Sequence, residues 1–203
     1  PYLSRGLGDV YKRQGRGYVT YHEDSDKFSL SPEQAAVFAR ENEPTCIQGL
    51  MQGVVGQFVK EDVAIDVFKT GRGRPWGEHH ECCFCGTERF FRPAYAGHLL
   101  DEWIPAMSGV EEKLKMGAKV ADIGCGLGTS SMLMAEQYPN STIHAFDFHE
   151  PSIEEAKKRA KEKGLSNLEF FVSDAAAIPN ESYDLACIFD AWHDMGDPVE
   201  VQF

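Results

Sequence analysis

Short apolar runs alternate with amphipathic stretches along the second half of the chain. Such runs, bounded by turn residues, are typical of the buried strands of a parallel sheet, and apolar residues recurring at three and four positions are typical of helices. The pattern predicts helices at 130–137 and 151–163. It predicts four strands, at 120–123, 142–147, 168–172 and 183–190. Alternation of strand and helix predicts an α/β fold with a parallel sheet.

The first half of the chain has a different pattern. Strand-like segments at 18–21 and 27–30 flank a polar turn and predict a β-hairpin. Ser31 and Gln34 have the spacing of a capping box, with Pro32 at the first position of the following helix.

Two further helical regions follow. One apolar stripe over 44–68 predicts one or two connecting helices that pack on the domain formed by the second half of the chain. A loop is expected after it, and 97–116 predicts two short helices divided at Pro105.

A glycine-rich turn follows the first predicted strand. Gly124, Gly126 and Gly128 stand at alternate positions, and Asp122 precedes them by two residues. Strand, glycine turn and helix are the layout of a nucleotide-binding crevice, where a ligand lies at the carboxyl end of the strand. A dinucleotide fingerprint has its third glycine one residue later, where this chain has Thr129.

Acidic residues follow the next two predicted strands. Asp147 ends the second strand, 19 residues after Gly128, and a carboxylate there can accept hydrogen bonds from ribose hydroxyls. Asp174 follows the third strand. The order of glycine loop, Asp122, Asp147 and Asp174 is more specific than any one of these features.

Together these residues resemble the motifs of class I S-adenosylmethionine-dependent methyltransferases. The resemblance covers residues 97–203 and implies a Rossmann-like sheet with S-adenosyl-L-methionine as the cofactor. The residues that it places at the cofactor are Asp122, Gly124, Cys125, Gly126, Gly128, Asp147, Phe148, Asp174, Ala175 and Asp190.

His193-Asp194 resembles the His-Asp pair of winged-helix O-methyltransferases, in which the histidine is the general base. The resemblance implies a small-molecule acceptor, methylated at oxygen with His193 as the catalytic residue. It also makes His79, His80 and Trp192 candidate substrate contacts. The hairpin before residue 31 resembles the wing of such a module, whereas an ordinary surface hairpin fits the pattern equally well.

Two histidines and three cysteines lie close together at His79, His80, Cys82, Cys83 and Cys85. Cys82 and Cys85 have the spacing of a zinc-ligand pair, but the chain has no second pair at the usual separation. The expectation is therefore no metal, with Cys125 and Cys187 as small apolar residues and not nucleophiles.

The composition of the chain bears on its partners and on its cellular compartment. A formal net charge of −12 over 203 residues disfavours nucleic acid as a partner. No apolar run is long enough to span a membrane, and the cysteine pattern is not that of a disulfide framework, which favours the cytoplasm. Whether the parent protein is a homodimer stays open.

The two ends of the chain carry expectations of their own. Residues 1–14 resemble a translated sequencing adaptor and are set apart from the fold. The expected division is then a remnant of a winged-helix module with connecting helices at 15–70, a loop segment near the substrate pocket at 71–96, and a C-terminally truncated methyltransferase domain at 97–203. A fragment with only four parallel strands is expected to be poorly stable.

Two other functions remain open from the sequence. One is an NAD(P)-dependent oxidoreductase, which the glycine spacing disfavours. The other is a non-catalytic winged-helix regulator whose Rossmann-like domain senses a ligand, which the acidic composition disfavours.

Overall fold

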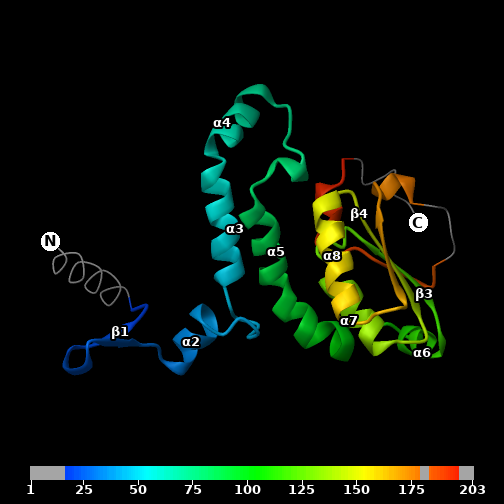
Figure 1. Cartoon of the computed structure of the whole chain (residues 1–203), viewed down its shortest axis with the longest axis horizontal. Helices are drawn as coiled ribbons and strands as arrows, with labels where there is room; N and C mark the ends of the chain where they lie inside the picture. Colours follow the sequence, from blue (N-terminus) through cyan, green and yellow to red (C-terminus); the bar gives the residue numbers. More distant parts are fainter. Residues whose placement is uncertain (1–16, 179–182, 197–203) are drawn as a thin grey trace.

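The computed structural model describes residues 17–178 and 183–196 (Figure 1). The predicted adaptor segment, 1–14, lies outside the described residues. In chain order the elements are β1 (Thr20–His22), η1 (Glu23–Ser25), β2 (Lys27–Ser29), α2 (Pro32–Phe38), α3 (Gln48–Val59), α4 (Glu61–Thr70), η2 (Trp76–Glu78), α5 (Glu81–Ala94), the π-helix η3 (Tyr95–Trp103), α6 (Val110–Met116), β3 (Lys119–Ile123), α7 (Thr129–Gln137), β4 (Thr142–Asp147), α8 (Glu150–Glu162), β5 (Leu168–Val172), η4 (Ala175–Ala177), β6 (Leu185–Cys187) and η5 (Trp192–Asp194).

The sheet confirms the predicted Rossmann-like α/β fold. Its order is β5-β4-β3-β6, and every neighbouring pair is parallel. The chain therefore moves outward from β3 to β5 and then returns to the other side of β3. That reversal creates a crevice at the carboxyl ends of β3 and β6, where open α/β sheets bind their ligands.

The last predicted strand is shorter than expected. The sequence predicts a strand over 183–190, whereas only Leu185–Cys187 pair with β3. Asp190 has a φ of +55°, in the left-handed region that a strand does not adopt. The chain therefore leaves the sheet before Asp190 and turns toward η5.

One face of the sheet carries the main core. Side chains from η3, α6, α7 and α8 pack there against alternate residues of the strands, including Val120 and Ile143, which are fully buried. Ala121, Ile123 and Phe146 point to the other face, where they meet residues of the segment that follows β5 and β6. Within the described residues, the helices that form the main core thus lie on one face.

The predicted hairpin and capped helix are confirmed. β1 and β2 pair antiparallel, with Tyr21 opposite Phe28. At the start of α2, the Gln34 backbone amide donates to Ser31 Oγ at 3.2 Å, and the Ser31 amide donates to Gln34 Oε1 at 2.8 Å. That this hairpin is the wing of a winged-helix module stays a prediction.

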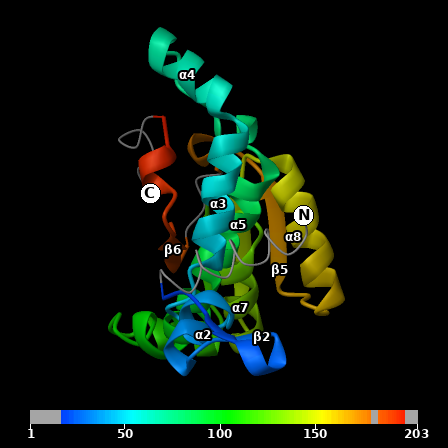
Figure 2. The same ribbon diagram turned by 90° about the vertical axis from the view of Figure 1, so that its left-hand side faces the viewer.

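The prediction of a loop over 71–96 is wrong for most of that length, because Glu81–Ala94 form α5. Figure 2 shows α3 lying along α5. Glycines explain the close approach: a Cβ on Gly49 would lie 2.3 Å from the Phe90 amide nitrogen, and one on Gly86 would lie 2.4 Å from that of Gly53. The prediction that the apolar stripe of α3 packs on the catalytic domain is wrong, because Met51, Val55 and Phe58 are exposed and α3 packs on α5 through its glycines.

The helices differ in how apolar they are, but none of those in the described parts of the chain is both long and apolar enough to cross a lipid bilayer.

Candidate functional site

A cavity of ≈ 980 Å³ opens at the carboxyl ends of β3, β4 and β6. Its other walls come from α3, η2 and α5, which lie across from the sheet in Figure 1. Ligand pockets typically measure about 300–1,000 Å³. The cavity is therefore large enough for a nucleoside cofactor and a second small molecule together.

The glycine loop forms the floor of this cavity. The backbone amides of Gly124 and Cys125 both donate to the Phe146 carbonyl, at 2.8 and 3.0 Å, which ties the loop to β4. Gly124 has a φ of +72°, and a Cβ there would lie 2.4 Å from Ala191 Cβ. Only glycine fits this position, because it allows the loop and the segment after β6 to meet.

Asp147 stands at the end of β4, where the sequence places it. The Gly126 amide donates to its Oδ2 and the His149 amide to its Oδ1, both at 2.8 Å. The side chain is 8% exposed and lines the cavity. A carboxylate has about four acceptor positions, so two backbone donors orient it and leave capacity for the hydroxyls of a ligand.

Four other predicted cofactor residues line the same cavity: Phe148, Asp174, Ala175 and Asp190. Asp174 Oδ1 accepts a hydrogen bond of 2.9 Å from the Ala176 amide, which fixes the turn after β5. A non-glycine residue with positive φ, such as Asp190, is uncommon and is found more often at functional sites than elsewhere.

Asp122 and Gly128 do not line the cavity. Asp122 is 1% exposed, and its Oδ2 accepts hydrogen bonds of 2.6 Å from both Ser130 and Ser131. Burial, which exceeds the opposing effect of these hydrogen bonds, raises the pKa of its carboxyl. At Gly128 a Cβ would lie 2.7 Å from the Phe170 ring. Both residues therefore support the loop and α7 on the side that faces away from the cavity.

His193 and His79 line the cavity, whereas His80 and Trp192 are not among its lining residues. His193 is 64% exposed, with Nε2 3.5 Å from Asp194 Oδ1 and Nδ1 3.8 Å from Asp190 Oδ1. His80 instead caps α5, because its Nδ1 accepts from the Cys82 amide at 3.2 Å.

The cysteine cluster is spread around the first turns of α5. Cys83 is buried and Cys85 is exposed, and all six cysteines of the chain are free. Burial raises the pKa of both thiols. Across the described ranges, no group of three His, Cys, Asp or Glu side chains is arranged to hold a metal ion.

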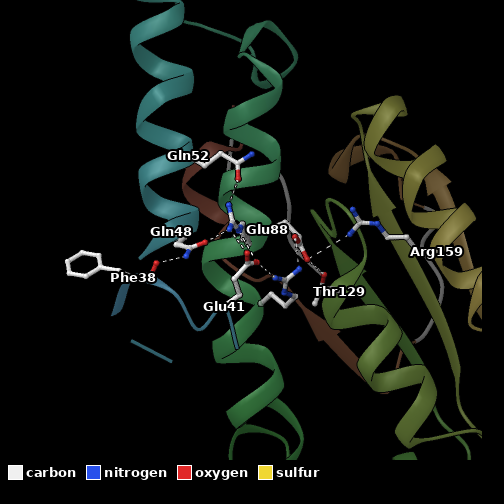
Figure 3. A network of polar contacts seen from close by, with 9 residues as sticks. Phe38, Glu41, Gln48, Gln52, Glu88, Thr129 and Arg159 are labelled. Carbon is white, nitrogen blue, oxygen red and sulfur yellow. Dashed lines mark hydrogen bonds and ion pairs between the residues drawn. The ribbon is translucent and has the colours of Figure 1, made fainter. Parts of the chain in front are cut away.

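Glu88 is a cavity residue that the sequence analysis missed. Its side chain is 13% exposed, and Thr129 Oγ1 donates to its Oε1 at 2.9 Å. Arg92 and Arg159 approach the same carboxylate at 3.7 and 3.8 Å. Figure 3 shows this carboxylate between α5 on one side and α7 and α8 on the other. The four-residue spacing of Glu88 and Arg92 was visible in the sequence, but the contact with Thr129 was not.

The polar network continues from Glu88 toward the N-terminal segment. Arg92 also pairs with Glu41, at 3.1 Å, and Arg89 bonds Glu41, Gln48 and Gln52 (Figure 3). Polar contacts therefore link the segment after α2, the helices α3 and α5, and Thr129, which directly follows the glycine loop.

Aromatic side chains form the wall between α5 and β6. The Tyr95 ring lies 5.3 Å from that of Phe189 and 6.2 Å from that of Trp103, measured between ring centroids. Burial raises the pKa of the Tyr95 hydroxyl, and the negative charges of Asp122 and Asp190 raise it further. Tyr95 therefore stays protonated, and its ring adds an uncharged surface to this wall.

The fold and the site define a Rossmann-like nucleotide-binding domain, and the comparisons with known proteins specify it further. Residues 114–202 match the family described as "Methyltransferase domain". This match includes the glycine loop, Asp147, Asp174 and His193. The matched region, which is less than half of the chain, is similar to a methyltransferase domain, and S-adenosylmethionine is the cofactor that the match indicates.

The chain is similar to two kinds of curated methyltransferase. It is 40% identical over 72 residues to aklanonic acid methyltransferase DauC of Streptomyces sp. (strain C5), covering 34% of this chain and 33% of that protein. It is 33% identical over 111 residues to tRNA (guanine-N(7)-)-methyltransferase of Edwardsiella ictaluri (strain 93-146), covering 46% of each. The chain thus spans between a third and a half of the length of these relatives.

A solved structure, a putative S-adenosyl-L-methionine-dependent methyltransferase from Methanococcus maripaludis, is also similar. It matches with a TM-score of 0.48 and 21% identity, over 59% of this chain and 54% of that one.

Proposed function

We propose that this protein transfers the methyl group of S-adenosylmethionine to an oxygen atom of a small-molecule acceptor, with His193 as the general base. One observation supports this most directly: the predicted cofactor residues Gly126 and Asp147 and the candidate base His193 line a single cavity. The matched methyltransferase domain supports the same reaction class.

The residues at the glycine loop fit the cofactor. A Cβ on Gly126 would meet open space, so a ligand can approach the backbone closely there. The Asp147 carboxylate is held by two backbone donors and keeps acceptor positions for ribose hydroxyls. Asp174, Ala175 and Asp190 line the same cavity, and we assign the first two to the adenine and Asp190 to the methyl-donor end. Asp122 supports this site indirectly, through Ser130 and α7.

S-adenosylmethionine, when bound, supplies a methyl group that is already activated at a sulfonium. The protein then mainly positions the acceptor and excludes water, and orientation alone can contribute several kcal/mol, roughly 7–11 in the best cases. An imidazole is the side chain best suited to accept the acceptor's hydroxyl proton near neutral pH. The carboxylates of Asp194 and Asp190, whose oxygens lie 3.5 and 3.8 Å from the ring nitrogens of His193, can orient the imidazole.

A tRNA acceptor is the second candidate, because the chain is 33% identical over 111 residues to a tRNA methyltransferase. The composition favours the small molecule, since a net charge of −12 repels a phosphate backbone. Acidic residues on the cavity wall, among them Asp190 and Asp194, act in the same direction.

The first test is calorimetric titration of the full chain with S-adenosylhomocysteine. We expect binding, weakened at least tenfold by Asp147→Ala, because a hydrogen bond to a charged group contributes about 1.5–3 kcal/mol. Asp62→Ala, an exposed residue of α4, is the matched control and should bind like the wild type. A chain that circular dichroism shows to be folded, yet does not bind, would refute the cofactor assignment.

The second test separates the acceptors and the base. Turnover is measured with a panel of phenols and with unmodified tRNA, using S-adenosylmethionine labelled in its methyl group. We expect label in the phenol fraction, and we expect His193→Gln to lower kcat and remove its dependence on pH while S-adenosylhomocysteine binds as before. Label that appears only in tRNA would establish the second candidate.

A further inference from the structure

Arg74 is the one Lys or Arg among the described residues that line the cavity. It is partly buried, and its hydrogen bonds go to neutral groups. Nη1 donates to Gln57 Oε1 and Nη2 to the Glu78 carbonyl, both at 3.3 Å. Its Nε is buried and has no partner in the described part of the chain. A buried N–H group without an acceptor is costly, so an acceptor group that enters the cavity and reaches Nε would be favoured there.

The other arginines in the described ranges are neutralised. Each of them lies within 4 Å of a carboxylate: Arg40, Arg72, Arg89, Arg92 and Arg159. Between residues 17 and 178 and from 183 to 196, no such partner is found for Arg74. Arg74 is therefore the described guanidinium that remains available to pair with an anion.

Arg74 and Asp194, the neighbour of the candidate base His193, act electrostatically on the same two side chains, His79 and Cys83. The charge of Arg74 helps burial to lower the pKa of His79, while Asp194 acts in the opposite direction on the same imidazole. Cys83 is within electrostatic reach of the same two charged groups. Arg74, His79, Cys83 and Asp194 all line the cavity.

The charges around Arg74 restrict the anion that would bind. The carboxylates lining the cavity are Glu88, Asp147, Asp174, Asp190 and Asp194. One guanidinium among them can compensate a single negative charge, which favours a carboxylate over a phosphate dianion. The planar fork of arginine also matches a carboxylate in a bidentate pair.

We propose that Arg74 binds the carboxylate of the methyl acceptor, and that the acceptor is therefore an aromatic carboxylic acid. The aromatic part is inferred from the rings that line the cavity, among them Trp76, Phe84, Phe91, Tyr95 and Phe189. This inference rests on the proposed function. The acid group anchors the acceptor at Arg74, and the hydroxyl to be methylated then lies toward His193.

The test compares an acid with its neutral isostere on the full chain. 2-Naphthoate and 2-naphthamide are titrated calorimetrically, with and without saturating S-adenosylhomocysteine. We expect the wild type to prefer the acid by roughly tenfold or more, as a charge-assisted hydrogen bond predicts. Arg74→Gln should remove this preference, and Arg74→Lys should restore part of it. Arg72→Gln is the matched control, because Arg72 belongs to the same loop but pairs with Asp66 and Glu78.

Three results would overturn the proposal. The wild type could bind acid and amide equally, or the preference could survive in Arg74→Gln. Arg74→Gln could also weaken S-adenosylhomocysteine but not 5′-methylthioadenosine, which lacks the carboxylate, so that Arg74 would belong to the cofactor site. Failure of the proposed function gives a different result: wild-type protein that does not bind S-adenosylhomocysteine, whatever its preference for the acid. Circular dichroism of each variant shows that the comparison is made on folded protein.

Discussion

We expect Glu88 to stabilise the contact between α5, which forms one wall of the cavity, and Thr129, which directly follows the glycine loop at its floor. Its hydrogen bond from Thr129 Oγ1, at 2.9 Å with a carboxylate that is 13% exposed, belongs to the class worth about 1.5–3 kcal/mol. The contacts with Arg92 and Arg159, at 3.7 and 3.8 Å, involve side chains a third exposed and add at most about 1 kcal/mol each. Glu88→Gln keeps an acceptor for Thr129 but loses the charge, so we expect the free energy of unfolding to fall by about 1–3 kcal/mol.

A double-mutant cycle isolates this contact. Urea unfolding is measured for wild type, Glu88→Gln, Thr129→Val and the double variant, with Glu162→Gln at an exposed position of α8 as the control. We expect the two single changes to be coupled by about 1 kcal/mol or more, and the control to change stability by less than about 0.5 kcal/mol. Additive effects, within about 0.3–0.5 kcal/mol, would refute the link between α5 and the glycine loop. Glu88→Gln should also weaken S-adenosylhomocysteine binding, because α5 forms one wall of the cavity.

Three other changes follow from the geometry. Gly124→Ala should lower the free energy of unfolding by about 1–3 kcal/mol, because its Cβ would overlap Ala191. The same change should weaken S-adenosylhomocysteine binding more than tenfold. Gly97→Ala is the control, and it should leave stability and binding unchanged because a Cβ there meets open space. Gly86→Ala should lower the melting temperature by several degrees, since its Cβ would press on the backbone of α3, at about 2–4 °C per kcal/mol. Burial raises the pKa of Asp122 above 3.8, so its contribution to stability is fully present below that pH and is lost as the pH rises through the raised value. Urea unfolding between pH 4 and 7 should show that Asp122→Asn removes this part of the dependence; an unchanged slope would contradict it.

The sheet and its loop were predictable because their signals are local. Each strand is an apolar run, and the turn glycines are needed by the backbone itself, as at Gly124. Asp147 was predictable for the same reason, since the end of a parallel strand faces the crevice wherever the strand lies. The position of Asp122 was also readable: in a strand, residues two apart share a face, so Asp122 lies on the side of Val120, which packs into the helix-covered core.

The wall opposite the sheet was not predictable, because its contacts join distant parts of the chain. Gly49 and Gly86 are 37 positions apart in the printed sequence, and each matters only because the other helix backbone is close. A cysteine- and histidine-rich stretch suggested a loop, and only contact with α3 shows why Gly86 is tolerated within a helix. The residues that this wall brings to the cavity, Glu88 and Tyr95 among them, were missed with it.

Arg74 shows the same limit most clearly. In the sequence it is one of two arginines in a short glycine-rich loop, and nothing distinguishes it from Arg72. The structure separates them by their partners: Arg72 has two carboxylates within 4 Å, whereas Arg74 has an amide oxygen and a backbone carbonyl. Since burying a charge without a counter-charge is unfavourable, the residue that the folded chain leaves uncompensated is the one whose partner arrives from outside. If the acid and amide probes bind Arg72→Gln and Arg74→Gln alike, this reasoning fails for the loop as a whole.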